Sequence, residues 1–423
     1  MERVILISAV FPPEPVVSAS VSRDIAEHLS KKYPLTVICP RPTRPFGFRF
    51  EQSFHSAFWQ TIRVNSFTYA RSGLFGRLRE SYSFGKHCAA AIRGLSDDTG
   101  CIYLNAWPLA AQYLIVRAAV KLKIPCVVHV QDLYPESLIA KLPFARKLFY
   151  RILLPADRYI LRQCTAVITI SEQMKQRLAS TRGIGPDKIT VAANWQNDEP
   201  FTRFREEMAY HDLPRNKLFT FMYLGNNGPL AGTSLLIKAF VRAGLRNARL
   251  VIAGSGSMTA ACKDLARQHP EQVIDFIPVP EGMVPAVQSQ ADVLLLPVMK
   301  NAAMSSVPSK LPAYMFSSKP IVGCLDPESD TARAIVDSGC GLVVEPENET
   351  ELAKAMHKCM SWSPGTRADK GNAGFVYAMK HYTRKGNLKQ IVSVVENILN
   401  HDREPYPTRS YQPGRFRTPE VVQ

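Results

Sequence analysis

The sequence predicts an α/β protein built from two parallel-sheet domains. Short apolar runs rich in Val and Ile alternate with amphipathic helical stretches along almost the whole chain. The runs are apolar at consecutive positions, as are strands that are covered on both faces of a parallel sheet. A chain of 423 residues is also too long for one compact core and suits two domains of roughly 200 residues each.

Twelve runs are predicted as strands, six in each half of the chain. Those in the first half are Val4–Val10, Leu35–Cys39, Cys101–Leu104, Cys126–Val130, Ala166–Ile170 and Ile189–Ala192. Those in the second half are Phe219–Leu224, Leu250–Ala253, Val273–Phe276, Val293–Leu296, Ile321–Cys324 and Leu342–Val344. Helices are expected between them, such as Ser20–Lys32, which carries Val21, Ile25 and Leu29 on one face.

Changes in composition along the chain predict the domain boundaries. The polar stretch Trp195–Pro214 separates the two series of strands, and the pattern is wholly helical from Pro364 to Asn400. We therefore expect an N-terminal domain over residues 1–200, a C-terminal domain over residues 201–375 and a last helix over residues 376–400. Residues 401–423 are rich in proline and arginine and poor in apolar residues, which predicts a disordered tail.

Cysteine usage and hydropathy indicate a reducing compartment. The nine cysteines are odd in number, contain no Cys-x-x-Cys pair and mostly lie in apolar runs, which favours buried thiols over disulfides or a zinc site. The first run, Val4–Val10, fits a buried strand better than a signal peptide. Because no run approaches the roughly 20 apolar residues needed to cross a bilayer, we expect a soluble or peripheral protein.

The net charge of +16 is unevenly distributed. Residues 1–200 carry 26 Lys and Arg against 15 Asp and Glu, a net +11, and the rest of the chain carries +5. This excess is either a solvated basic surface or an attraction to an anionic partner such as phospholipid, lipid pyrophosphate or nucleic acid. No recognised nucleic-acid-binding module accompanies the charge, so we expect no nucleic-acid partner.

A dinucleotide-binding dehydrogenase is the first alternative for such a chain. That class needs glycines directly after the first strand, so that backbone can approach the pyrophosphate. Here the turn after the first strand, Phe11–Val17, contains no glycine. The dehydrogenase hypothesis therefore fails.

Several motifs follow one another along the chain in a specific order. They are Asp-Leu-Tyr-Pro-Glu at 132–136, Asn-Trp at 194–195, Gly-Asn-Asn-Gly at 225–228, Gly-Ser-Gly at 254–256, Pro-Ser-Lys at 308–310, Tyr-Met at 314–315 and Lys-Pro at 319–320. In this order the chain resembles the GT-B glycosyltransferases of family 4, especially the bacterial branch that builds O-antigen, capsule and exopolysaccharide and includes fucosaminyl- and colanic-acid-type transferases. The resemblance implies two Rossmann-like domains that face each other across a cleft, with a C-terminal helix returning to the N-terminal domain.

The resemblance also implies the activity. A sugar would pass from a nucleoside diphosphate sugar to a lipid-linked saccharide acceptor in surface polysaccharide biosynthesis, with retention of configuration. The enzyme would act in the cytoplasm, peripherally on the inner face of the plasma membrane. The nucleotide sugar would be a co-substrate, and neither a cofactor nor a metal is expected. The alternative is a degenerate homologue that serves as a scaffold in an assembly complex.

The chemistry of transfer explains the donor-side residues. A diphosphate leaves, so the protein must stabilise growing negative charge with prearranged donors. Lys310 lies at a predicted helix start and is the expected catalytic cation; otherwise it is a solvated lysine. The expected donor-binding residues are Gly225, Asn226, Asn227, Gly228, Gly254, Ser305, Ser306, Ser309, Lys310 and Tyr314. The alternative for the glycine loop at 225–228 is a plain turn between a strand and a helix.

On the acceptor side, Asp132 follows the strand Cys126–Val130 after one intervening residue, at an edge where α/β proteins bind ligands. Its carboxylate is the second expected catalytic group, and an N-cap or turn aspartate is the alternative. Tyr134 and Asn194 are expected to line the cleft, although packing at the hinge is an equal alternative for Asn194. His129 is expected to be a core residue.

Some positions depart from the family. Two glutamates that many members carry eight residues apart are replaced here by Ser305 and Ala313, and a basic residue after the first glycine loop is replaced near Ala231. Loss of the second glutamate would remove a contact with the ribose.

Three segments combine basic and apolar side chains: Arg41–Phe54, Arg71–Arg79 and Lys141–Arg162. Each is either a solvated face or part of a patch that contacts anionic lipid. Together they favour binding to an anionic membrane surface.

Overall fold

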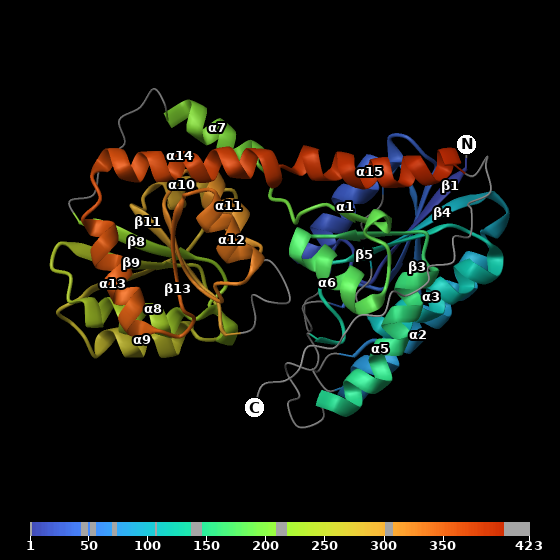
Figure 1. Ribbon diagram of the computed structural model, residues 1–423, viewed down its shortest axis with the longest axis horizontal. Helices are drawn as coiled ribbons and strands as arrows, with labels where there is room; N and C mark the ends of the chain where they lie inside the picture. Colours follow the sequence, from blue (N-terminus) through green and yellow to red (C-terminus); the bar gives the residue numbers. More distant parts are fainter. Residues whose placement is uncertain are drawn as a thin grey trace.

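The structure is a computed structural model that describes residues 2–43, 50, 56–69, 74–105, 108–136, 146–208, 218–300 and 308–401. It consists of two α/β lobes, with the N-terminal half on the right of Figure 1 and most of the C-terminal half on the left. Each lobe has one sheet in which all recorded strand pairs are parallel. The predicted fold class is confirmed.

The N-terminal sheet has the strand order β3-β2-β1-β4-β5-β6-β7. Its strands are β1 Arg3–Ser8, β2 Leu35–Pro40, β3 Gln60–Val64, β4 Thr99–Asn105, β5 Cys126–Val130, β6 Ala166–Thr169 and β7 Ile189–Val191. The α-helices of this lobe are α1 Val17–Ser30, α2 Leu74–Arg93, α3 Leu109–Leu122, α5 Arg146–Gln163 and α6 Glu172–Arg182. The order reverses between β1 and β4, the place where parallel sheets usually bind ligands.

All six strands predicted for this half are present, but β3 was missed. Its sequence Gln-Thr-Ile-Arg-Val alternates polar and apolar residues, and only Val64 is buried. A strand at the end of the sheet is covered less than the central strands, so it lacks the continuous apolar run by which the others were identified.

The C-terminal sheet has the order β10-β9-β8-β11-β12-β13, and its six strands agree with the prediction. They are β8 Phe219–Leu224, β9 Ala248–Ala253, β10 Val273–Ile277, β11 Val293–Pro297, β12 Ile321–Cys324 and β13 Gly341–Val344. The α-helices around them are α8 Thr233–Ala243, α9 Thr259–Arg267, α10 Val284–Ser289, α11 Lys310–Phe316, α12 Asp330–Asp337 and α13 Glu349–Met360.

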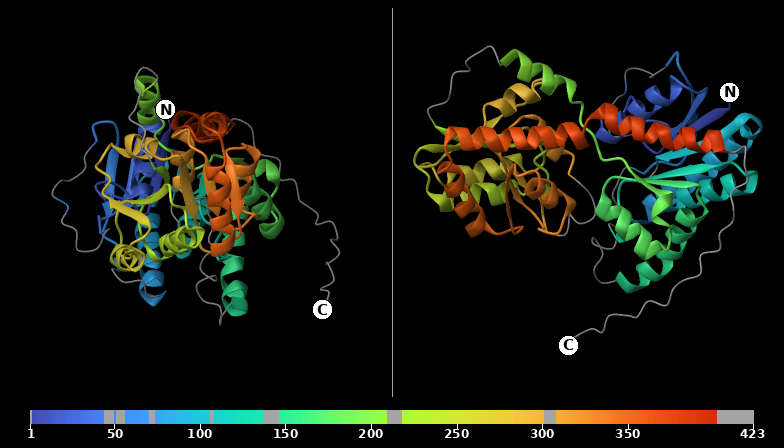
Figure 2. Two further views of the ribbon diagram at one scale, coloured as in Figure 1. Left: turned by 90° about the vertical axis from the view of Figure 1, so that its left-hand side faces the viewer. Right: turned by 45° about the horizontal axis from the view of Figure 1, so that its top comes forward.

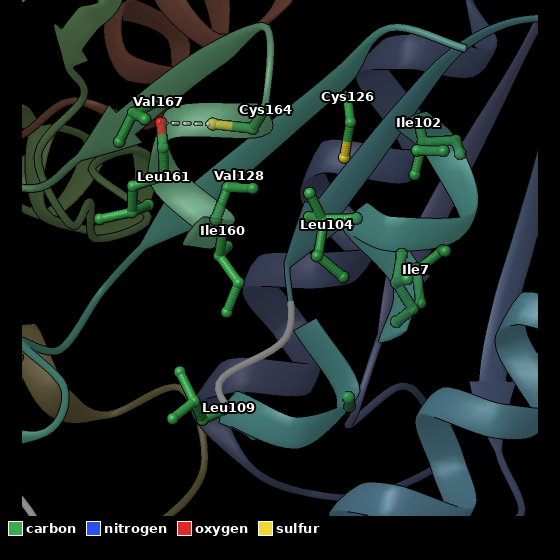
Figure 3. Close-up of a cluster of buried hydrophobic side chains, with 14 of the residues drawn as sticks. Ile7, Ile102, Leu104, Leu109, Cys126, Val128, Ile160, Leu161, Cys164 and Val167 are labelled. Carbon is green, nitrogen blue, oxygen red and sulfur yellow. Dashed lines mark hydrogen bonds between the residues drawn. The ribbon is translucent and has the colours of Figure 1, made fainter. Parts of the chain in front are cut away.

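Each sheet is packed with apolar side chains on both faces. Figure 3 shows part of one N-terminal cluster, where Leu104 and Val128 from neighbouring strands lie near Ile160 of α5. All nine cysteines are buried and free, as their apolar settings predicted. Burial raises the pKa of the Cys164 thiol to about 11, so this thiol remains protonated and unreactive.

Two consecutive helices cross from one lobe to the other (Figures 1 and 2). α14, Pro364–His381, packs against α11 of the C-terminal domain, whereas α15, Arg384–His401, places Leu388, Ile391 and Val395 in an N-terminal core cluster. The returning helix therefore begins at Arg384, and the predicted boundary between residues 375 and 376 falls inside α14. Residues 402–423, most of the predicted tail, lie outside the described residues.

The linker also differs from its prediction. The stretch Trp195–Pro214 was expected to be a plain polar linker, but it contains α7, Glu199–Met208. Phe201 of this helix is buried in the C-terminal core, so the expected boundary at residues 200 and 201 falls inside an element of the second domain. The amphipathic spacing of α7 was not recognised as a helix because the segment contains many charged residues. Across the described ranges, none of the helices has both the length and the hydropathy required to span a membrane.

Candidate active site

The carboxyl edges of the two sheets face each other. Ser171, directly after β6, donates a hydrogen bond of 2.5 Å from its hydroxyl to the carboxylate of Asp330, at the start of α12 after β12. Nearby, the side-chain amide of Gln173 donates to the carbonyl of Glu328 over 2.8 Å. Because the strands within each sheet run parallel, these contacts bring the loops after the other strands to the same interdomain region.

On the C-terminal side, the loops after β8 and β9 touch through their backbones. Gly254 has φ +107°, and a Cβ added there would collide with the carbonyl oxygen of Gly225. A Cβ at Gly256 would lie only 2.5 Å from the carbonyl oxygen of Asn227. Only glycine allows this approach, so the two predicted glycine loops form one structural unit.

Asn227 joins these loops and does not face the cleft. It is fully buried, its backbone N–H donates to the Ser255 carbonyl over 3.0 Å, and its carbonyl accepts from the Met258 N–H over 2.9 Å. Its side-chain amide donates to the Thr259 hydroxyl over 3.2 Å. These backbone groups hold the two loops together, and a contact of Asn227 with the donor stays a prediction.

The neighbours of Asn227 are better placed for a ligand. The Asn226 side chain is exposed at the tip of the loop and Gly228 is half-buried. A short 3₁₀ turn, Pro229–Ala231, separates this loop from α8, and Ala231 is buried. The position where many family members carry a basic residue therefore belongs to the core in this chain.

Lys310 lies across the first glycine loop. Its aliphatic stem passes so close to Gly225 that a Cβ there would collide with the Lys310 Cε. Its amine lies 5.4 Å from the centroid of the Tyr223 ring, and burial lowers the pKa of this amine. A diphosphate beside the ammonium would favour its charged form, so a desolvated lysine at this point is a suitable anion ligand.

The other predicted donor residues have different roles. Tyr314 is fully buried, and its hydroxyl accepts from the N–H of Leu224 over 2.8 Å and donates to the Leu224 carbonyl over 3.0 Å. Tyr314 thus supports the end of β8, and its contact with the donor stays a prediction. Ser309 is exposed beside Lys310, and Ser305 and Ser306 lie outside the described residues. Ala313 is 8% exposed and belongs to the core.

On the N-terminal side, Asp132 is exposed two residues after the end of β5. The segment that follows it is held by Arg182, at the end of α6, which is completely buried. The Arg182 guanidinium donates to both carboxylate oxygens of Glu136 over 2.7 and 2.6 Å, to the Tyr134 carbonyl over 2.7 Å and to Asp157 over 2.7 Å. We call these four residues the Arg182 cluster.

The charge of Arg182 keeps the carboxylate of Glu136 ionised, whereas burial raises the pKa of Asp157 to about 6. Burial raises the pKa of Glu136, but the hydrogen bonds and charge of Arg182 outweigh burial, so the net pKa of Glu136 is lowered. The motif at residues 132–136 therefore contains an exposed carboxylate, Asp132, and a structural one, Glu136. Sequence reasoning missed Arg182 because it lies 46 residues after Glu136 in a helix that reads as ordinary and polar.

A chain of polar side chains fixes the residue before Asp132. The Gln131 amide donates to the Asn105 carbonyl oxygen over 2.9 Å, and the Asn105 amide donates to the Ser22 hydroxyl over 2.9 Å. The hydroxyls of Ser22 and Ser8 lie 2.8 Å apart. This chain connects the ends of β5, β4 and β1 with α1, and it could not be predicted because the four residues are far apart along the chain.

The remaining predicted residues lie behind the carboxyl edge of the N-terminal sheet. His129 is buried in β5 with its Nδ1 2.9 Å from the Tyr103 hydroxyl, and burial lowers the pKa of its imidazole to about 4. It is a neutral core histidine, as expected. Trp195 is buried and donates from its indole to Asp24 over 3.0 Å, next to a 2.6 Å ion pair between Asp24 and Arg384. Asn194, beside this hinge, is half-buried.

Comparison with known families agrees with this division into two halves. Residues 18–199 match the model of Glycosyltransferase Family 4, and residues 219–361 match the model of Glycosyl transferases group 1. The two matches fall on the N-terminal and C-terminal sheets and together span most of the chain. No curated protein sequence matches this chain.

Solved structures share the fold at low sequence identity. Sucrose-phosphate synthase from Thermosynechococcus elongatus superposes with a TM-score of 0.70 at 15% identity, covering 95% of this chain and 100% of that one. Anabaena Alr3699/HepE in complex with UDP gives 0.66 at 15% identity, covering 94% and 100%. WaaG, a glycosyltransferase involved in lipopolysaccharide biosynthesis, gives 0.62 at 13% identity, covering 93% and 99%.

Proposed function

This chain is a glycosyltransferase of the family 4, GT-B type, and we propose that it transfers a sugar from a nucleoside diphosphate sugar to a lipid-linked saccharide. The observation that carries the proposal is the juxtaposition of Lys310 with the joined glycine loops. A half-buried cation beside loop backbone, at the carboxyl edge of a parallel sheet, is suited to a diphosphate.

Lys310 has a simple role in this proposal. As the bond from sugar to diphosphate breaks, negative charge grows on the leaving group, and the Lys310 ammonium stabilises that charge from a fixed position. Asn226, Gly228 and Ser309 lie close enough in the chain to complete the donor site. No metal or cofactor is required in this scheme. Solved structures of HepE contain UDP or UDP-glucose, which supports the choice of nucleotide sugars as first candidates.

Asp132 acts on the other side of the cleft. It is exposed at the edge that faces the C-terminal domain, and the Arg182 cluster and Gln131 hold the segments on either side of it. We propose that its carboxylate accepts a hydrogen bond from the acceptor hydroxyl or the donor sugar as transfer occurs with retention of configuration. Tyr134 and Asn194 flank the acceptor in this scheme.

The lipid end of the acceptor requires a membrane surface, for which α2 provides an apolar face. Phe75, Leu78 and Tyr82 are spaced on one side of this helix and are 86%, 40% and 57% exposed. Arg79, on the same helix, is exposed and stacks on Phe67 at 4.3 Å. We propose that this face binds anionic lipid at the cytoplasmic side of the plasma membrane, where the enzyme extends a surface polysaccharide. Most of the predicted basic segment Arg41–Phe54, with Phe46 and Phe48, lies outside the described residues.

A thermal-shift panel of nucleoside diphosphates and nucleotide sugars tests the donor site. A ligand at 100 times its dissociation constant should add roughly 2.7 kcal/mol to the free energy of unfolding. The shift should shrink in Lys310→Ala and persist in Lys238→Ala, whose exposed amine lies on the outside of α8. No response to any nucleotide would contradict the donor assignment.

Vesicle sedimentation tests the membrane face. Wild-type protein should sediment with anionic vesicles, bind neutral vesicles little, and be partly released by high salt because salt screens only the electrostatic part. Phe75→Asp should weaken sedimentation, while Val376→Asp, a matched exposed apolar position on α14, should not. Equal and salt-insensitive binding to both vesicle types would refute this part of the proposal.

One observation favours a second function. Ala313 is buried in the core where many relatives carry the glutamate that contacts the ribose. A chain that had lost this contact could serve as a scaffold in a polysaccharide assembly complex without transferring sugar. The same nucleotide panel separates the two functions, since a scaffold would give no thermal shift with any donor.

A further inference from the structure

Tyr223, the penultimate residue of β8, lies where Lys310 and the first glycine loop meet. Its side chain is completely buried in a core cluster of the C-terminal domain. Its ring lies 5.4 Å from the Lys310 amine, and its hydroxyl donates to the Asn226 carbonyl over 2.9 Å. A Cβ added at Gly225 would collide with the Lys310 Cε and lie 3.2 Å from the same hydroxyl. One buried side chain therefore contacts both parts of the proposed diphosphate site.

The hydroxyl of Tyr223 fixes one peptide group of the loop. The carbonyl of this peptide belongs to Asn226 and accepts from Tyr223, and its N–H belongs to Asn227 and donates to the Ser255 carbonyl over 3.0 Å. Burial raises the pKa of the Tyr223 phenol to about 12, so the hydroxyl stays protonated and remains a donor. Because a peptide group is planar, these two bonds fix its orientation beside the exposed side chain of Asn226.

The ring of Tyr223 supports the cation. An ammonium that lies over an aromatic face within about 6 Å of its centroid is attracted by the negative charge of that face, and the Lys310 amine meets this condition. Burial disfavours the charged form of Lys310 and lowers its pKa, and the ring offsets part of this cost. A carboxylate could do the same, but it would also repel a diphosphate. The ring stabilises the ammonium without that repulsion.

We propose that Tyr223 is a positioning residue for the donor: its ring holds the Lys310 ammonium and its hydroxyl holds the loop at Asn226, so that both meet the diphosphate in a fixed geometry. This inference rests on the proposed function and adds to it the residue that couples the two parts of the donor site. Groups that are already oriented bind a ligand without the cost of ordering them at the moment of binding. The ring and the hydroxyl act on different partners, so their contributions can be separated by substitution.

Isothermal titration of the full chain with UDP, GDP, ADP and dTDP tests the proposal. The nucleotide that wild type binds most tightly is then used with two variants of Tyr223. Tyr223→Phe keeps the ring and removes the hydroxyl, and it should weaken affinity by about two- to tenfold, as the loss of one hydrogen bond typically does. Tyr223→Leu also removes the ring and should weaken affinity by about a further two- to fivefold.

The same two substitutions in a Lys310→Met background distinguish positioning from packing. Methionine keeps an aliphatic side chain at this position and removes the charge, so the ring no longer has an ammonium to hold. In this background Tyr223→Leu and Tyr223→Phe should bind the nucleotide equally well, because only the effect of the missing hydroxyl remains. A ring that merely fills space would give the same difference between the two variants in both backgrounds, and this result would overturn the proposal.

Phe221→Leu is the matched control. Phe221 is completely buried in the same strand and the same cluster, and its ring packs against Phe219 and Phe240. This variant should lower the melting temperature about as much as Tyr223→Leu and bind nucleotide as wild type does. The proposal is also overturned if Phe221→Leu weakens the nucleotide as much as Tyr223→Leu does.

Two further outcomes separate this proposal from the proposed function. If Tyr223→Leu does not fold, Tyr223→Phe decides the outcome, and wild-type affinity in Tyr223→Phe overturns the role of the hydroxyl. If wild type binds a nucleotide and both variants bind it equally well, the failure concerns Tyr223 alone. If wild type binds none of the four nucleotides, the proposed function fails and this inference fails with it.

Discussion

In the C-terminal domain the loops after β8 and β9 touch through backbone atoms, whereas in the N-terminal domain the loops after β1, β4 and β5 are joined by side chains. Gly254 and Gly225 leave no room for a Cβ between them. In contrast, Arg182 makes charged hydrogen bonds to Glu136 and Asp157 from a completely buried position.

This difference between backbone packing in the C-terminal domain and side-chain bonding in the N-terminal domain follows from the two proposed ligands, a diphosphate and an acceptor hydroxyl. A diphosphate is recognised by backbone N–H groups and a cation, so its loops must be small and closely packed. An acceptor hydroxyl needs one oriented carboxylate, and orientation comes from neighbouring side chains that are themselves hydrogen-bonded. The C-terminal edge should therefore be sensitive to side-chain volume, and the N-terminal edge to charge and pH.

The largest effect on stability is expected from Arg182→Met. Removing one partner of a buried ion pair leaves uncompensated carboxylates on Glu136 and Asp157, which typically costs about 3–5 kcal/mol. Chemical denaturation measures the loss. The control is Arg158→Met in the neighbouring α5, whose more exposed guanidinium donates to the Thr181 carbonyl and should matter little. A loss below about 1 kcal/mol for Arg182→Met would show that the Arg182 cluster does not hold this edge.

A smaller, pH-dependent effect is expected from His129. Burial lowers the pKa of His129 from 6.5 to about 4 in the folded chain, so below pH 6.5 the unfolded chain binds a proton that the folded chain does not. Stability should fall as the pH decreases from 6.5 to 4, by about 3 kcal/mol from this residue. His129→Gln keeps a polar partner for Tyr103 and should flatten this part of the profile. Identical pH profiles for the two proteins would rule out His129 as the cause.

The smallest effect is the difference in stability cost between substitutions at two glycines with positive φ. Gly254 (φ +107°) faces the carbonyl oxygen of Gly225, whereas Gly282 (φ +77°) has no atom within 4 Å of an added Cβ. Gly282→Ala should cost about 1–2 kcal/mol of backbone strain, and Gly254→Ala should cost about 2 kcal/mol more because its Cβ collides with backbone. Only Gly254→Ala should also weaken nucleotide binding. Equal losses in both variants would mean that close loop packing is unimportant.

Regular features were predictable from the sequence, and features that depend on distant residues were not. Continuous apolar runs predicted twelve of the strands. The strand β3 was not predicted because its apolar residues alternate with polar ones at the edge of the sheet. The helix α7 was not predicted because five of its ten residues are charged. In both cases one buried residue, Val64 or Phe201, joins a core formed by other segments.

The same limit applies to the site. The order of motifs located Asp132, Lys310 and the glycine loops, but it could not distinguish residues that face the cleft from residues that support it. Asn227 and Tyr314 are inside motifs and are buried: the backbone of Asn227 bonds to Ser255 and Met258, and the Tyr314 hydroxyl bonds to the backbone of Leu224. Such roles depend on pairs of residues that are neighbours only after folding.

The central claim is that Lys310 stabilises the charge of the leaving diphosphate, whereas Asp132 acts on the sugar or the acceptor hydroxyl during transfer. Paired measurements of turnover and of nucleoside diphosphate affinity in Lys310→Ala and Asp132→Asn test it most directly. Lys310→Ala should lower turnover by about a hundred- to a thousand-fold, roughly 3–4 kcal/mol, and should weaken the nucleotide as well. Asp132→Asn should lower turnover while leaving nucleotide affinity unchanged. Near-wild-type turnover in Lys310→Ala, or a parallel loss of turnover and nucleotide affinity in Asp132→Asn, would contradict this division of roles.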